Sequence, residues 1–163
     1  AAGRDGRDRL ASAAGGLADD ARVPWYGPSM GGKSFLTARL MEAWAHGQDG
    51  VDAVGGHRPA TDRLRHIAHI GYVTREFSYI NRGMSMPDKP VRLELVSPNG
   101  EAWTWGPSDA EEVVVATAYE FCKVLTRRLP LRESTVETTG ALAAEWMEIA
   151  QPWIEPPRIS DEA

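Results

Sequence analysis

Apolar side chains in the first third of the chain recur at the spacing of an α-helix. Five of them fall within an arc of roughly 80° between residues 34 and 54: Leu36, Leu40, Trp44, Val51 and Val54. The pattern predicts an amphipathic helix over residues 34–54 whose apolar stripe faces the core. A weaker helical pattern over residues 4–20 is interrupted by the pair Gly15-Gly16.

A second apolar stripe follows in residues 61–80. Its members are Ile67, Ile70, Phe77 and Ile80. Thr61 or Asp62 can act as the N-cap of this helix, and Asn81-Arg82-Gly83 is a typical C-terminal stop. Residues 23–28 contain two prolines and a glycine, which predicts a loop before the first strong helix.

The pattern changes to alternation after residue 90. Residues 91–95 and 103–105 alternate with period two, and Asn99-Gly100 lies between them, which predicts a β-hairpin with its turn at that pair. Ser108 and Glu111 fit a capping box, so the apolar run after them predicts a helix that ends near Leu125. A short strand over residues 135–138 and a helix over residues 141–150 complete the pattern.

These elements predict an α+β protein. We expect a helical unit over residues 1–84, a small hairpin-plus-helices domain over residues 90–152, and an irregular tail over residues 153–163.

The 163-residue chain has a net charge of −5, which argues against electrostatic binding to nucleic-acid phosphates. No apolar run approaches the roughly 18–20 residues needed to cross a bilayer, and the single cysteine cannot form an internal disulfide. We therefore expect a cytoplasmic protein.

Three polar side chains of the predicted 34–54 helix have spacings that suit a metal site. Glu42, His46 and Asp49 are four and three residues apart, which places them within an arc of about 60°. A Glu and a His one turn apart can reach the same cation, at about 2.0–2.2 Å for zinc. Asp49 could add a third ligand or accept a hydrogen bond from the imidazole N–H.

The same spacing also occurs on helix faces that meet only solvent. Arg39 lies beside the three residues, and the apolar stripe lies opposite, as on the solvated side of an amphipathic helix. An exposed pair at this spacing stabilises a helix by only about 0.2–0.5 kcal/mol. Spacing alone leaves both interpretations open and favours the solvated face.

Longer runs around these residues resemble a known family. They are similar to an actinobacterial group of metal-binding proteins, related to the mycothiol-dependent maleylpyruvate isomerases within the DinB-like four-helix-bundle superfamily. The Glu-x-x-x-His-x-x-Asp block is the most specific element of the resemblance. The similar runs are residues 23–30 (VPWYGPSM), 38–49 (ARLMEAWAHGQD), 65–69 (RHIAH), 81–83 (NRG) and 103–107 (WTWGP).

The resemblance implies an up-down helical bundle with a divalent metal, typically zinc. In the family, the metal is held by a histidine from an early helix and by a Glu and a His one turn apart on a later helix. Glu42 and His46 match the later pair, but no histidine precedes residue 46. The resemblance therefore implies an incomplete bundle that lacks an N-terminal segment with one ligand. It also implies mycothiol as a cosubstrate, and contact between an anionic ligand and Arg127 or Arg128.

Four other residues have a chemistry of their own. His66 and His69 lie one turn apart on the predicted 61–80 helix, where they could supply a replacement ligand. The favoured interpretation is that both are partly buried and hydrogen-bonded. His57 belongs to a loop, where we expect it to be exposed. Cys122 has apolar neighbours, which favours a core residue over a catalytic thiolate.

Three functions are consistent with these observations. The leading hypothesis is a metal-binding, mycothiol-dependent isomerase or thiol transferase, in which the metal lowers the thiol pKa from about 8.5. Its partners would be a small-molecule thiol and an electrophilic substrate, with a homodimer as one option. The second hypothesis is a non-catalytic metal-binding or structural protein. The third is a protein related to tRNA wyosine-base formation, since some relatives carry that label, but an acidic chain gives it little physical support.

Overall fold

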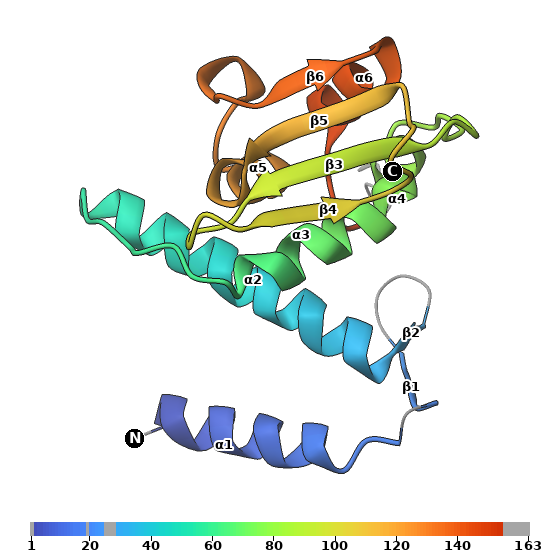
Figure 1. The fold of residues 1–163 in the computed structure, drawn as a ribbon. Helices are drawn as coiled ribbons and strands as arrows, with labels where there is room; N and C mark the ends of the chain where they lie inside the picture. Colours follow the sequence, from blue (N-terminus) through green and yellow to red (C-terminus); the bar gives the residue numbers. More distant parts are fainter. Residues whose placement is uncertain (1, 19, 25–28, 155–163) are drawn as a thin grey trace, which may run out of the picture.

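The computed structural model describes residues 2–18, 20–24 and 29–154. Helix α1 spans Ala2–Gly15 and is followed by two short antiparallel strands, β1 (Arg22–Val23) and β2 (Met30–Gly31). Helix α2 spans Gly32–Ala53. In Figure 1, α1 is the element farthest from the main sheet, with α2 between it and the sheet. The helix predicted over residues 34–54 is confirmed, and the predicted loop over 23–28 lies largely outside the described residues.

The buried face of α2 differs from the predicted stripe. Trp44 is buried as expected, but Val54 is 81% exposed, and the other buried side chains are those of Met41, Ala45 and Gln48. Helix α2 packs against α3, and the ring of Trp44 lies edge-on to Tyr119 of α5, with centroids 6.3 Å apart, so the neighbouring helices decided the buried face. The expectation that Val54 belongs to the core was wrong.

The helix predicted over residues 61–80 is divided in two. Helix α3 spans Leu64–Val73 and α4 spans Arg75–Ile80, with Thr74 outside the helical range at φ −102° and ψ 21°. The Thr74 hydroxyl donates to the carbonyl of Ile70 at 2.6 Å, a competing hydrogen bond that commonly bends helices. The predicted caps are also corrected, because Asp62 accepts from the Asn99 side chain and makes no cap hydrogen bond.

The second half of the chain contains a four-stranded sheet in the order β4-β3-β5-β6 (Figure 1). Strands β3 (Val91–Val96) and β4 (Ala102–Trp105) form the predicted antiparallel hairpin. Its turn places Gly100 at φ 82°, a conformation that glycine adopts without strain. Strand β5 (Glu112–Thr117) lies parallel to β3, and β6 (Glu137–Thr139) pairs antiparallel with β5.

The helix predicted from Ser108 to Leu125 was wrong in its first half. Residues 112–117 form the inner strand β5, and helix α5 spans only Ala118–Leu125. The β-branched run Val113-Val114-Val115 fits a pleated strand better than a helix. Thr117 is the N-cap of α5, where its hydroxyl accepts the Glu120 N–H at 3.2 Å.

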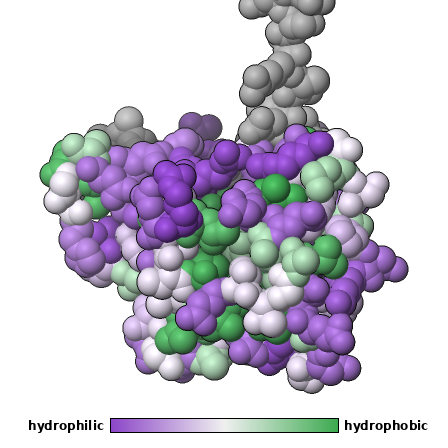
Figure 2. Space-filling model, turned by 90° about the horizontal axis from the view of Figure 1, so that it is seen from above, coloured by the Kyte–Doolittle hydropathy of each residue, from purple (hydrophilic) through white to green (hydrophobic). Residues whose placement is uncertain are grey.

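The remaining elements are a short 3₁₀ turn, η1 (Leu131–Glu133), and helix α6 (Ala141–Ile149). The predicted helix over 141–150 is confirmed, and the strand predicted at 135–138 occurs as β6, shifted toward the C-terminus. Seen from the β6 side, hydrophilic side chains cover most of the surface and hydrophobic ones form smaller groups between them (Figure 2). Within the described part of the chain, no helix is long and apolar enough to cross a membrane.

One buried cluster runs from α2 to the end of α6. It contains Trp44 of α2, Ile67 of α3, Leu93 of β3 and Phe121 of α5. The ring of Trp146 packs edge-on against Phe121, with centroids 6.0 Å apart. The α+β class is therefore confirmed, whereas the helical bundle and the division into two domains stay predictions.

Candidate functional site

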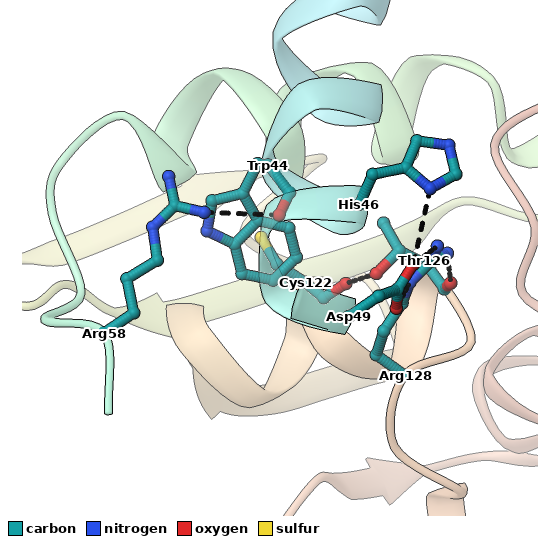
Figure 3. Close-up of polar contacts among 7 residues, drawn as sticks. All are labelled: Trp44, His46, Asp49, Arg58, Cys122, Thr126 and Arg128. Carbon is teal, nitrogen blue, oxygen red and sulfur yellow. Dashed lines mark hydrogen bonds and ion pairs between the residues drawn. The ribbon is translucent and has the colours of Figure 1, made fainter. Parts of the chain in front are cut away.

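Helix α2 places the three predicted metal-site residues on neighbouring turns. His46 Nδ1 lies 3.3 Å from Asp49 Oδ2, while Glu42 is paired with Arg39 on the preceding turn. Figure 3 shows His46 and Asp49 on one side of α2, while Arg58 reaches the Trp44 carbonyl from the other side. The predicted common face is therefore present for His46 and Asp49.

A cavity of about 320 Å³ lies beside this face. Glu42 and His46 line it from α2, Thr126 and Arg128 line it from the C-terminal end of α5, and Trp153 lines it from the segment after α6. Met41 and Ala45 complete the lining. The cavity thus brings together segments that are far apart in the sequence.

Asp49 connects α2 to the end of α5 through an ion pair. Its carboxylate accepts from Arg128 Nε at 2.9 Å and from Nη2 at 2.8 Å, a bidentate arrangement. The hydrogen bonds from Arg128 hold the pKa of Asp49 below its ordinary value. Asp49 is therefore engaged by Arg128 and can orient the His46 imidazole at the same time (Figure 3).

The site is more open than an inward-facing metal centre in a bundle. The side chain of His46 is 76% exposed, that of Asp49 is 48% exposed and that of Glu42 is 33% exposed. Among the described residues, no group of three or more His, Cys, Asp or Glu side chains could hold a metal ion. The ligand set Glu42, His46 and Asp49 stays a prediction.

The three residues include two types of metal ligand, the Glu42 carboxylate and the His46 imidazole, and one group that can orient the imidazole, the Asp49 carboxylate. Because His46 Nδ1 faces Asp49, the neutral tautomer with Nδ1–H leaves Nε2 as the ligand atom. A carboxylate oxygen and an imidazole nitrogen are ordinary ligands of zinc. Glu42 and His46 are therefore of the types that zinc takes as ligands, Glu42 is also paired with Arg39, and a zinc ion bound by both residues stays a prediction.

The other histidines lie outside this cavity. His69 Nδ1 accepts a hydrogen bond from the Trp105 indole at 3.2 Å, which confirms the expected hydrogen bond, but both His66 and His69 are exposed and were expected to be partly buried. His57 is exposed, as expected, and lines a separate cavity of about 270 Å³ beside Arg58.

Cys122 is a core residue, as predicted. Its side chain is fully buried, and its thiol donates to the carbonyl of Leu64 at 3.6 Å. Burial raises the pKa of the Cys122 thiol far above its ordinary value. A thiolate at this position is therefore disfavoured.

The two arginines at the end of α5 have different partners. Arg128 is paired with Asp49, whereas Arg127 Nη1 donates to Gln151 Oε1 at 3.1 Å. Contact of either residue with an anionic ligand stays a prediction. Sequence reasoning missed Thr126 and Trp153 as cavity residues, because Trp153 was assigned to an irregular tail and no local signal connects it to α2.

Comparison with known proteins supports the family expected for the N-terminal part. Residues 1–49 match the family model described as the mycothiol maleylpyruvate isomerase N-terminal domain. The match ends at Asp49, so it includes all three predicted metal-site residues.

Two uncharacterized proteins, from two strains of Mycobacterium tuberculosis, are similar to most of the chain. Each is 44% identical over 151 residues, which are 93% of this chain and 59% of the relative. The chain thus spans less than two thirds of the length of these relatives. No solved structure matches the chain.

Proposed function

We propose that the cavity beside α2 binds a divalent cation together with a small-molecule thiol. In this proposal the chain contributes to a mycothiol-dependent isomerase or thiol transferase. The observation that carries the proposal is the match of residues 1–49 to the mycothiol maleylpyruvate isomerase N-terminal domain, which includes Glu42 and His46. Both residues also line one cavity of the size of a small ligand.

Four residues that line the cavity or lie beside it have a role in this proposal. Glu42 and His46 Nε2 would hold the cation, and Asp49 keeps the imidazole in the tautomer that leaves Nε2 as the ligand atom. Arg128 fixes Asp49 in turn through the bidentate ion pair. When bound, the cation would lower the pKa of the thiol from about 8.5, so that a thiolate is present near neutral pH to add to an electrophilic carbon.

Metal binding by the chain and its variants tests the site. We expect titration calorimetry with Zn²⁺ to give affinities at least about 100-fold weaker for Glu42→Ala and His46→Ala, because each variant removes one of two protein ligands. Asp49→Asn should weaken binding by about 10- to 100-fold, the usual effect of losing an orienting carboxylate.

Glu76→Ala and His57→Ala provide matched controls. Both side chains are exposed, and neither lines the cavity of Glu42 and His46. Zinc affinity should be unchanged in both. Equal zinc affinity in the wild type, Glu42→Ala and His46→Ala would remove the proposed site.

A non-catalytic metal-binding protein is the second candidate, because His46 is largely exposed. Mycothiol-dependent isomerisation of maleylpyruvate by the zinc-loaded chain distinguishes the two candidates. Turnover that requires both zinc and mycothiol supports the enzyme. Zinc binding without turnover favours the non-catalytic protein.

A further inference from the structure

The segment after α6 closes one side of the cavity beside Glu42 and His46. Its residue Trp153 lines the cavity together with Met41 and Ala45 of α2. These three side chains are apolar, whereas Glu42, His46 and Arg128 supply the polar part of the lining. The cavity can therefore receive a small molecule that has one apolar and one polar end.

Buried hydrogen bonds to α4 hold this segment in place. Gln151 N donates to Ser78 Oγ at 3.0 Å, and Ser78 Oγ lies 3.2 Å from the Gln151 carbonyl, to which it can donate. Both residues are only 1% exposed. Asn81 Nδ2 donates to the carbonyl of Trp153 at 2.6 Å, so the backbone is fixed on both sides of residue 152.

Arg127 adds a contact to the same segment from an unfavourable backbone conformation. Its φ is 63°, the left-handed region, at the position after the end of α5 where glycine is the usual residue. Arg128 N donates to the carbonyl of Lys123 at 2.7 Å, which completes this helix end. The side chain of Arg127 donates to Gln151 Oε1 at 3.1 Å, a contact that glycine could not make.

The charges around the cavity are paired within the protein. Arg128 is paired with Asp49, and Glu42 is paired with Arg39. A ligand group that reaches Glu42 or Arg128 therefore competes with an ion pair of the protein, and Trp153 is the only tryptophan, tyrosine or phenylalanine side chain among the described residues that line the cavity. Aromatic rings prefer offset or edge-on contact with another flat group.

We propose that Trp153 determines which ligands the cavity accepts, by packing against a flat apolar group of a small molecule. Arg127 is a positioning residue that holds Trp153 in place through Gln151. The inference rests on the proposed function only for the nature of the ligand, which would be the thiol or the electrophilic substrate.

Two thiols that differ in a phenyl ring test this role on the metal-free chain. Benzyl mercaptan and 2-mercaptoethanol are titrated, and binding is followed through the backbone amide NMR signals of Ala45 and Thr126. We expect the wild type to bind benzyl mercaptan about tenfold more tightly. Trp153→Ala should reduce this ratio to about two or less, while Trp153→Phe should retain most of it. An equal ratio in wild type and Trp153→Ala would overturn the proposal, as would a wild type without aromatic preference.

Arg127→Gly separates positioning from stability. Glycine adopts the left-handed conformation without strain, which offsets the lost hydrogen bond to Gln151, so the melting temperature should change little. The ratio between the two thiols should nevertheless drop about threefold, since the Gln151 contact is lost. Arg132→Ala is the control, because its side chain is exposed and pairs with Glu133 away from this cavity. An unchanged ratio in Arg127→Gly would refute the positioning role.

The use of metal-free protein keeps this test separate from the proposed function. Glu42→Ala and His46→Ala retain Trp153, so they should keep the aromatic preference even if they lose zinc. Equal zinc affinities in the wild type, Glu42→Ala and His46→Ala, together with an intact Trp153 effect, would contradict only the proposed function. Zinc binding that depends on Glu42 and His46, together with an aromatic preference that Trp153→Ala leaves unchanged, would contradict only the role of Trp153.

Discussion

Helix α1 and the helices on the sheet both carry apolar side chains, but only the latter bury them. Leu10 of α1 and Leu17 beyond its end are 45% and 40% exposed, whereas Phe121 and Trp146 are fully buried. None of the α1 side chains that the structure describes is buried. Helical periodicity therefore specifies a helix, whereas the stability of that helix in the protein comes from what its apolar face packs against.

Trp146→Ala should have the largest effect on stability. The side chain is fully buried between Phe121 and Tyr72, and its removal would leave a large cavity. We expect a loss of about 3–5 kcal/mol in the free energy of unfolding, measured by urea denaturation. Leu10→Ala in α1 should change it by less than about 0.5 kcal/mol.

Trp146→Phe tests how much of this loss comes from the volume of the side chain. The indole Nε1–H of Trp146 has no hydrogen-bond partner among the described residues, so phenylalanine would lose volume but no hydrogen bond. Its cost should be clearly smaller than that of alanine. Equal costs for Trp146→Ala and Leu10→Ala would show that the two regions do not differ in packing.

Local sequence patterns predicted those elements whose neighbours in the fold are also neighbours in the chain. The hairpin of β3 and β4 was predicted because Asn99-Gly100 specifies the turn and the alternation specifies the register. Strand β5 was missed because its ladder with β3 is parallel, with Val91 opposite Glu112. The run of valines is apolar on both faces, so its periodicity does not separate strand from helix.

The candidate site was predictable only in its local part. Glu42, His46 and Asp49 belong to one helix, and their spacing alone places them on neighbouring turns. The partner of Asp49 is Arg128, which is 79 residues away in the sequence. Trp153 also reaches the cavity only through the tertiary fold, which no spacing rule describes.

Gly71→Ala should have the second largest effect. A Cβ on Gly71 would overlap with the side chain of Leu125, which is fully buried where α3 and α5 meet. We expect a loss of about 1–3 kcal/mol, the usual cost of overpacking, measured by the same denaturation.

Gly6→Ala is the matched substitution in α1. A Cβ on Gly6 would have no neighbour within 4 Å. Alanine should favour the α1 helix by about 0.5–1 kcal/mol and leave global unfolding nearly unchanged, as judged by helical circular dichroism. Destabilisation by both glycine substitutions would contradict the difference in packing.

Glu112→Gln should give the smallest change in the free energy of unfolding, and this change should depend most strongly on pH. The Glu112 side chain is 7% exposed, and its carboxylate accepts hydrogen bonds from the N–H groups of Leu142 and Ala143 at 2.9 and 3.0 Å, at the start of α6. These hydrogen bonds, that of Ala143 foremost, lower the pKa of Glu112 in the folded state. The stabilisation is therefore complete above the ordinary pKa of about 4.3 and is lost as the pH falls through the lowered value.

Glu112→Gln should destabilise the protein at pH 7 and weaken the decline in stability below about pH 4. Asp5→Asn, in the first turn of the exposed α1, is the control and should leave the pH profile of global unfolding unchanged. Parallel profiles for the wild type and Glu112→Gln would show that this carboxylate does not link the sheet to α6.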